Sequence, residues 1–312
     1  MLRVWIISLI FSICVVTGSS KPTRKGFDLG NATIPIKDIK DGGPRKDGIP
    51  AIDNPSFLSI AEVDYLKAED QVMSVTHDGI SRAYPIRILD HHEIVNDKIG
   101  DLAFAVTYCP LCGSGMIFNR KIKGEETTFG VSGLLYQSDV LLYDRATESL
   151  WSQLATKSVA GPRVDELLDW IPCEFMTWSS WKSRYEDGEV LSNKNGHRRN
   201  YDNTLYRGYE TSDRVYFPVP LYREELGIKT KVIGIVIDEQ ASAYDLALLI
   251  SGRQYTDNIG DRKLQVSYDH ESQLAVITDS DSGEAIPHVI AYWFAWQGFH
   301  PDTRLISINP KE

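Results

Sequence analysis

LAFAVTYCPLCGSGMIFNRKI, residues 102–122, is the stretch that decides the expected fold. Two apolar, strand-like runs at 102–108 and 116–122 flank a short loop that contains cysteine, proline and glycine. Runs of this length on either side of a turn-forming stretch are typical of a β-hairpin. We therefore expect residues 109–115 to form the tip of an antiparallel hairpin.

Further strand-like runs lie on both sides of this hairpin, at 72–76, 127–131, 140–143, 150–154 and 231–237. The short spacings between the runs that follow the hairpin predict an antiparallel meander. A short helix is expected over residues 177–185. The predicted fold class is α+β, mainly antiparallel β-strands with short helices.

The chain also resembles itself when it is shifted by 160 residues without a gap. In this register, nine of the 26 positions from 83 to 108 are identical, including Tyr84 with Tyr244 and Gly100 with Gly260. Self-similarity at a fixed shift is typical of an internal repeat. We therefore expect an internal duplication, with two related units at about 73–117 and 233–277.

The first twenty residues have the pattern of a secretory signal peptide. Arg3 precedes an apolar run at 4–16, and small residues follow at 17–20. The apolar run is too short for a comfortable membrane span. We therefore expect a secreted or periplasmic protein with no stable membrane span after cleavage. Residues 21–54 are expected to form an extended N-terminal arm, and 55–312 a single compact domain.

The composition excludes one class of partner. The formal net charge is -10, and no basic stripe is present that could bind phosphates, so a nucleic-acid partner is not expected. Hydrophobic residues make up 42% and charged residues 24%, which is ordinary for a soluble globular protein. Nothing in the sequence indicates an oligomeric state.

The most specific chemical signal is the Cys109-Pro-Leu-Cys112-Gly sequence at the expected hairpin tip. Two thiolates separated by two residues can chelate one tetrahedral ion, and the following glycine lets backbone N–H groups turn toward the sulfurs. A complete site needs further ligands from soft side chains elsewhere in the chain: His92 and Met116, with His91 and Cys173 as other candidates. Such a set favours copper, with zinc as the next choice.

Three other uses of the same cysteines remain open. Thiol–disulfide exchange is one, although a redox CxxC usually begins a helix, and Gly113 and Gly115 are poor helix formers. A metal-dependent enzyme with an open coordination position is another. A third alternative is a non-catalytic binding module in which the cysteines only hold the hairpin together. Whether the protein is an enzyme therefore stays undecided at this point.

Several long strings carry a resemblance to a known family: YPIRIL at 84–89, HEIVND at 92–97, TYCPLCGSG at 107–115, FGVSGLLY at 129–136, SLWSQ at 149–153 and WFAW at 293–296. Over nearly the whole mature chain, the sequence resembles the bacterial family catalogued as domain of unknown function 3179. The resemblance implies a shared fold and an exported or membrane-associated location, but no activity. It favours His92 over His91 as a ligand, because the matching string begins at His92.

Together these patterns predict an exported, soluble protein whose Cys109 and Cys112 bind a soft metal, copper in preference to zinc. Copper handling is the favoured role. A protein that donates the metal or accepts it is the expected partner.

Overall fold

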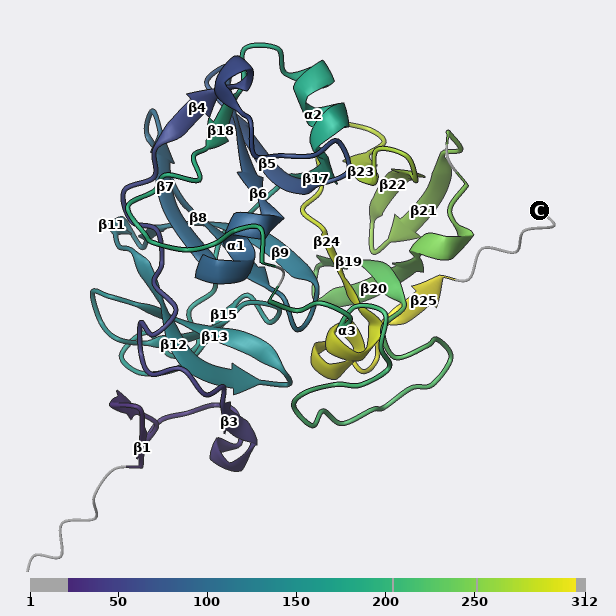
Figure 1. Cartoon of the computed structure of the whole chain (residues 1–312). Helices are drawn as coiled ribbons and strands as arrows, with labels where there is room; N and C mark the ends of the chain where they lie inside the picture. Colours follow the sequence, from purple (N-terminus) through teal and green to yellow (C-terminus); the bar gives the residue numbers. More distant parts are fainter. Residues whose placement is uncertain (1–21, 204, 251, 307–312) are drawn as a thin grey trace, which may run out of the picture.

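In the described part of the chain, five β-sheets of three to five strands each are arranged as the blades of a five-bladed β-propeller (Figure 1). The computed structural model describes residues 22–203, 205–250 and 252–306. Strands make up 42% and helices 11% of the structure, so the predicted α+β class is wrong. Because each α-helix has only seven residues, the helices form no layer of their own, and the core is made by sheets packing against sheets.

Two neighbouring blades contain the segment from which the sequence analysis began. One has the strand order β16-β9-β8-β7 and comprises β7 (Ile94–Ile99), β8 (Leu102–Cys109), β9 (Ser114–Asn119) and β16 (Trp170–Ile171). The other has the order β15-β14-β13-β12-β3 and comprises β3 (Ile39–Asp41), β12 (Phe129–Tyr136), β13 (Asp139–Asp144), β14 (Leu150–Ser152) and β15 (Lys157–Ala160). All strand pairs in these two blades are antiparallel.

Three further blades complete the propeller. The first is ordered β17-β5-β6-β18-β4 and comprises β4 (Phe57–Ser59), β5 (Gln71–His77), β6 (Ile80–Pro85), β17 (Glu174–Thr177) and β18 (Glu189–Leu191). The second is ordered β24-β19-β20-β25 and comprises β19 (Lys231–Ile237), β20 (Gln240–Asp245), β24 (Val289–Tyr292) and β25 (Arg304–Ile306). The third comprises β21 (Tyr255–Ile259), β22 (Arg262–Asp269) and β23 (Leu274–Asp279). Within these blades, β18 pairs with β6, and β25 with β20, in parallel.

Short elements lie between the strands. The α-helices are α1 (Ile86–His92), α2 (Trp178–Arg184) and α3 (Trp293–Phe299), and the 3-10 turns are η1 (Ile36–Asp38), η2 (Ile60–Glu62) and η3 (Leu246–Leu248). Two of these elements, α1 and η3, connect one blade to the next. Two small ribbons pair β1 (Thr23–Arg24) with β2 (Phe27–Asp28) and β10 (Lys121–Ile122) with β11 (Glu125–Glu126). Helix α1 follows Pro85 directly and ends at Glu93, whose φ of 58° is left-handed and stops the helix.

The prediction of two related units is not supported by the structure. Each range is divided between two blades: residues 73–117 contribute β5 and β6 to one and β7 to β9 to the next, and residues 233–277 contribute β19 and β20 to one and β21 to β23 to the next. Neither range is therefore a blade or a compact unit of its own. The residues that the two ranges share serve local needs of blade construction. Gly100 and Gly260 both take φ of 56° in a strand turn, while the Tyr84 and Tyr244 hydroxyls each donate a hydrogen bond to an aspartate.

The N-terminal part of the described chain lies against one blade. Phe27, Leu29 and Ile39 are buried and pack with Leu134 and Leu141 of β12 and β13. The predicted signal peptide, residues 1–20, lies outside the described residues. In the part of the chain that is described, no helix is long and apolar enough to cross a membrane.

Candidate metal centre

The two cysteines lie at the turn of the hairpin that the sequence predicts. Cys109 ends β8 and pairs with Ser114, the first residue of β9. The Cys112 N–H donates to the Cys109 carbonyl oxygen at 3.2 Å, so the loop closes tightly. Gly113 then takes φ of 60°, and a Cβ at this position would lie 3.1 Å from the Tyr292 ring. This residue must therefore be glycine for both conformation and space.

Asp139 from the neighbouring blade is the third member of the site. One atom of its carboxylate and the sulfurs of Cys109 and Cys112 all lie within 4.8 Å of one another. Asp139 begins β13, directly after a turn in which Gln137 and Ser138 both have positive φ, at 52° and 67°. That turn places the Asp139 carboxylate of the β12–β13 hairpin beside the cysteine loop of the β8–β9 hairpin.

The site is buried and incompletely hydrogen-bonded. Cys109, Cys112, Ser138 and Asp139 are each at most 2% exposed. Both thiols face the Ser138 carbonyl oxygen, with sulfur–oxygen distances of 3.8 Å for Cys109 and 3.4 Å for Cys112. One oxygen of Asp139 accepts from the Leu154 N–H at 3.0 Å, whereas its other oxygen and the Ser138 hydroxyl have no hydrogen-bond partner. Unpaired buried polar atoms are costly, and a ligand at this point would satisfy them.

In the absence of a ligand, burial determines whether Cys109, Cys112 and Asp139 are protonated. Burial raises the pKa of Cys112 well above its ordinary value and also raises that of Cys109. It raises the pKa of Asp139 to about 7, although the hydrogen bond from the Leu154 N–H acts in the opposite direction. The neutral forms are therefore favoured until a cation is present. A bound dication would reverse this preference, because it stabilises thiolates and carboxylates directly.

A second buried acid and two tyrosines lie beside these groups. Burial, followed by the charges of Asp139 and Asp90, raises the pKa of Glu93 to about 8. The Tyr209 hydroxyl donates to the Leu111 carbonyl oxygen at 3.0 Å. Tyr206 and Tyr209 belong to residues 192–230, which connect β18 to β19 without a helix or strand in the described positions. Both tyrosines pack on the apolar cluster that contains the cysteines, so this segment covers the site.

A polar network behind the hairpin fixes its position. The Ser114 hydroxyl donates to the Gln153 side-chain oxygen, and the Gln153 amide donates to the Thr107 hydroxyl, both at 2.8 Å. Thr107 in turn donates to the Met116 carbonyl oxygen at 2.8 Å. Because each of these buried groups is paired, the network holds β8, β9 and the segment after β14 in one arrangement.

Comparison with known families gives the same assignment as the motifs. A family described as "Protein of unknown function (DUF3179)" matches residues 46–303. The chain belongs to this family. No curated protein and no solved structure gives a significant match. The DUF3179 assignment confirms the resemblance drawn from the sequence and brings no activity with it.

The structure does not bring His92 of the DUF3179 string HEIVND to the cysteines. Its Nδ1 lies 2.7 Å from the Pro50 carbonyl oxygen, and its Nε2 lies 2.7 Å from the Tyr201 hydroxyl. Both ring nitrogens are therefore engaged elsewhere, and burial lowers the pKa of His92 to about 4. His91 points to the Asn203 carbonyl oxygen at 3.1 Å.

The two remaining sulfur candidates lie in different places. Met116 on β9 is buried in the same apolar cluster as Cys109 and Cys112, and its role as a ligand stays a prediction. Cys173 packs against a different cluster and lines a cavity with His288. The group that lies with the two thiols in the structure is the Asp139 carboxylate, which the sequence analysis did not single out.

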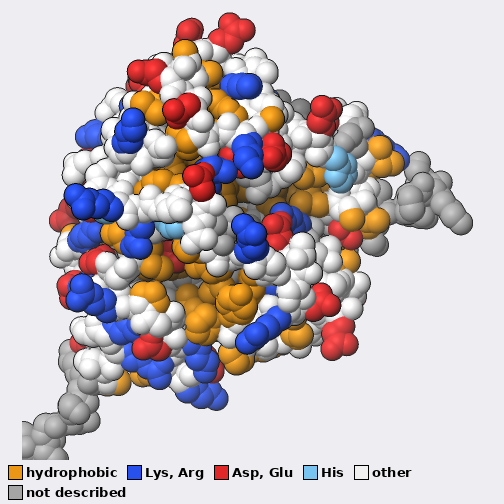
Figure 2. All heavy atoms as spheres, in the orientation of Figure 1, with side chains coloured by type: hydrophobic (Ala, Val, Ile, Leu, Met, Phe, Trp, Pro, Cys, Tyr) orange, Lys and Arg blue, Asp and Glu red, His pale blue; other side chains and the backbone are white. Residues whose placement is uncertain are grey.

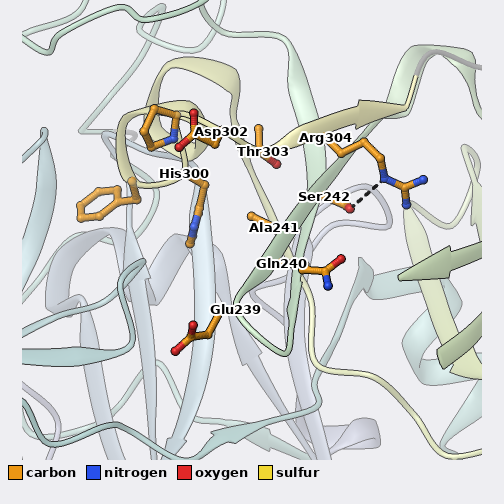
Figure 3. Close-up of a pocket in the computed structure, with 10 residues that line it drawn as sticks. Glu239, Gln240, Ala241, Ser242, His300, Asp302, Thr303 and Arg304 are labelled. Atoms are coloured by element: carbon orange, nitrogen blue, oxygen red, sulfur yellow. Dashed lines mark hydrogen bonds between the residues drawn. The ribbon is translucent and has the colours of Figure 1, made fainter. Parts of the chain in front are cut away.

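Two other features of the described chain resemble sites but are less suited to bind a metal ion. His77, Asp78 and Asp101 form a second cluster of metal-ligating side chains, but both aspartates are exposed to solvent. A cavity of about 480 Å³ lies between the β19–β20 turn and the residues after α3 (Figure 3). There Arg304 turns away from His300 and donates to Ser242 at 3.4 Å. None of the residues that line this cavity belongs to either cluster of ligating groups in the described chain.

Proposed function

We propose that this protein binds one transition-metal ion between Cys109, Cys112 and Asp139. The observation that supports the proposal most strongly is a third metal-ligating group beside the two thiols, the Asp139 carboxylate. An unpaired carboxylate oxygen lies in a buried site with two free thiols, and the three groups lie within 4.8 Å. In a tetrahedral site, zinc–sulfur bonds of about 2.3 Å and zinc–oxygen bonds of about 2.0–2.2 Å place ligand atoms roughly 3.5 Å apart. Only a small closure of the site is therefore needed.

The donor set favours zinc over copper. A carboxylate is harder than the histidine and methionine ligands expected from the sequence, and two thiolates with one carboxylate suit zinc well. Three protein ligands leave a fourth position for water, a substrate or a ligand from a metal-exchange partner. The signal-like segment at 1–20 supports an exported protein. In an oxidising compartment, a bound metal would keep the two sulfurs from forming a disulfide.

Metal analysis of the reduced protein tests this proposal. After equilibration with Zn²⁺ and removal of free metal, we expect about one equivalent bound to the natural protein, and a large loss in Cys109→Ser and in Asp139→Asn. Cys173→Ser is the matched control, because it removes a thiol that lies outside the site. Absence of bound metal in the natural protein, or equal losses in Cys109→Ser and Cys173→Ser, would contradict the proposal.

Thiol–disulfide exchange is a second candidate, and one observation favours it. Asp139 lies close enough to both sulfurs to accept a proton from the attacking thiol and to return it to the leaving thiolate. The burial of both thiols and their raised pKa values weigh against it, because the thiolate is the reactive form and needs access to its partner. Rapid alkylation of Cys109 and Cys112 in the folded, metal-free protein would favour this candidate over metal binding.

A further inference from the structure

Two adjacent cavities lead from the surface to the cysteine loop. The outer cavity has a volume of about 410 Å³ and the inner one about 60 Å³. They share four lining residues: Gln71, Glu210, Lys231 and Gln273. Tyr108 and Gly113, which also line the inner cavity, directly precede Cys109 and follow Cys112. We call these two cavities the passage.

The passage lies where several blades meet. Gln71 belongs to β5, Tyr108 to β8 and Lys231 to β19, while Gln273 lies in the turn between β22 and β23. Figure 2 shows that acidic and basic side chains lie close together on the face of the molecule that carries α1. Four blades thus contribute to its wall, so the passage depends on the closed propeller and on no single hairpin.

The outer cavity carries more acidic than basic groups. Its acidic residues are Glu69, Asp70, Asp90, Asp202 and Glu210, and its basic residues are Arg87 and Lys231. Arg87 pairs with Asp70 and Asp202, and Lys231 pairs with Glu210. Asp90 has no basic partner within the described chain, and burial together with the charge of Glu210 raises its pKa to about 7. A cation in this cavity would supply the missing positive charge.

The inner cavity offers hydroxyl groups that nothing else uses. Tyr108, Tyr268 and Tyr292 line it and are 8%, 8% and 4% exposed. No hydrogen bond joins their hydroxyls to another residue of the described ranges. None of these hydroxyls is among the fully buried atoms that lack a partner, so they keep some accessible surface and can bind a polar occupant of the cavity. A volume of about 60 Å³ admits only a few waters or a partly hydrated ion, and excludes a peptide or a nucleotide.

We propose that the passage is the route by which a transition-metal cation reaches Cys109, Cys112 and Asp139. The inference rests on the proposed function and adds the direction of entry. Asp90 and Glu210 attract the hydrated ion to the outer cavity. The tyrosine hydroxyls then replace part of its water in the inner cavity. Electrostatic attraction of this kind raises the rate of association more than the final affinity.

The test is the rate at which the reduced protein takes up Cd²⁺, followed by the thiolate-to-metal charge-transfer absorbance after rapid mixing. In Asp90→Asn/Glu210→Gln we expect the uptake rate constant to fall about tenfold at low ionic strength, with a smaller difference at high salt. The final stoichiometry should not change. Asp281→Asn/Glu284→Gln is the matched control, because it removes the same charge from an exposed turn outside the passage. Its uptake rate should stay close to that of the natural protein.

Each outcome has a separate meaning. Equal uptake rates in the passage variant and the natural protein, with metal bound in both, would overturn the route but leave the proposed function intact. Equal slowing in the passage and control variants would also overturn it, because net charge alone would explain the effect. No uptake by the natural protein would contradict the proposed function, and the route with it. The single variant Asp90→Asn, checked for folding by circular dichroism, guards against a structural effect of the Glu210 change.

Discussion

Asp139 is the residue on which the account of the site depends. Its side chain lies in the protein interior, beside two thiols, with one oxygen unpaired. In the sequence it is an aspartate directly after a turn, where this residue is usually a solvated turn former. The residues next to Asp139 in the sequence do not distinguish a solvated turn aspartate from a buried one. The contact of Asp139 with Cys109 and Cys112 joins two blades and therefore leaves no local signal. The sequence therefore predicted the thiols but not the carboxylate.

His92 is the converse: the sequence indicated it as a ligand, but in the structure its ring nitrogens face other groups. A histidine beside a cysteine motif is a reasonable ligand candidate, since imidazole binds zinc and copper well. In the folded chain its two nitrogens face Pro50 and Tyr201, which lie 42 and 109 residues away in the sequence. These partners come from irregular segments, so no periodicity or spacing could have revealed them.

The stability of the metal-free protein should depend on pH through two buried acids. Burial raises the pKa of Asp139 to about 7 and that of Glu93 to about 8, whereas both titrate near pH 4 in the unfolded chain. As the pH rises between these values, the unfolded state loses protons that the folded state keeps. Below about pH 6.5 the lowered pKa of His92 acts in the opposite direction, because the unfolded histidine takes up a proton that the folded one does not. The free energy of unfolding should therefore fall from about pH 6.5 to about pH 8, by on the order of a few kcal/mol.

Asp139→Asn isolates the contribution of one acid, because asparagine resembles the neutral carboxyl. Urea unfolding in the presence of a chelator should show a flatter pH dependence in this variant and greater stability than the natural protein near pH 8. Asp281→Asn, a change at an exposed position, should leave the slope as it is. A natural protein whose stability does not change over this pH range would contradict the assigned protonation.

At the scale of elements, the sequence predicted the structures that depend on neighbouring residues. It did not predict those that depend on pairing between distant parts of the chain. The hairpin around residues 109–115 is present as β8 and β9, the helix expected at 177–185 is α2, and the strand at 231–237 is β19. Each depends on side-chain alternation, helix capping or turn chemistry within a few residues. The parallel strands β18 and β25 and the closure of five blades depend on partners that are far away in the sequence, which carries no local signal for them.

The turn between β12 and β13 gives a prediction at this scale. Ser138 has φ of 67°, is 1% exposed, and its hydroxyl has no partner. Glycine would relieve the left-handed conformation and remove the unpaired hydroxyl, while the carbonyl oxygen that faces the thiols would remain. We expect Ser138→Gly to raise the free energy of unfolding by about 1 kcal/mol and to leave metal stoichiometry unchanged.

Chemical denaturation measures that change, and Ser138→Val is its counterpart. A β-branched residue fits a positive φ poorly, so the valine variant should be clearly less stable than the natural protein. Should glycine destabilise the protein as much as valine does, the strain and the unpaired hydroxyl would have been assigned wrongly.

At the scale of the whole molecule, the propeller explains why the site is buried and yet reachable. Cys109 and Cys112 come from one blade, Asp139 from the next, and the segment 192–230 covers them with Tyr206 and Tyr209. The passage enters where four blades meet. Separate strands could not produce this arrangement, so metal binding and closure of the propeller should be coupled, as expected when ligands come from distant parts of a chain.

The most direct measurement of the central claim is X-ray absorption spectroscopy at the zinc edge on the zinc-loaded, reduced protein. We expect two sulfur atoms at about 2.3 Å and oxygen at about 2.0–2.2 Å, with no contribution from an imidazole ring. The oxygen contribution should change in Asp139→Asn and stay the same when His92 is replaced. A zinc shell without sulfur, or one that contains histidine nitrogen, would contradict a site made by Cys109, Cys112 and Asp139.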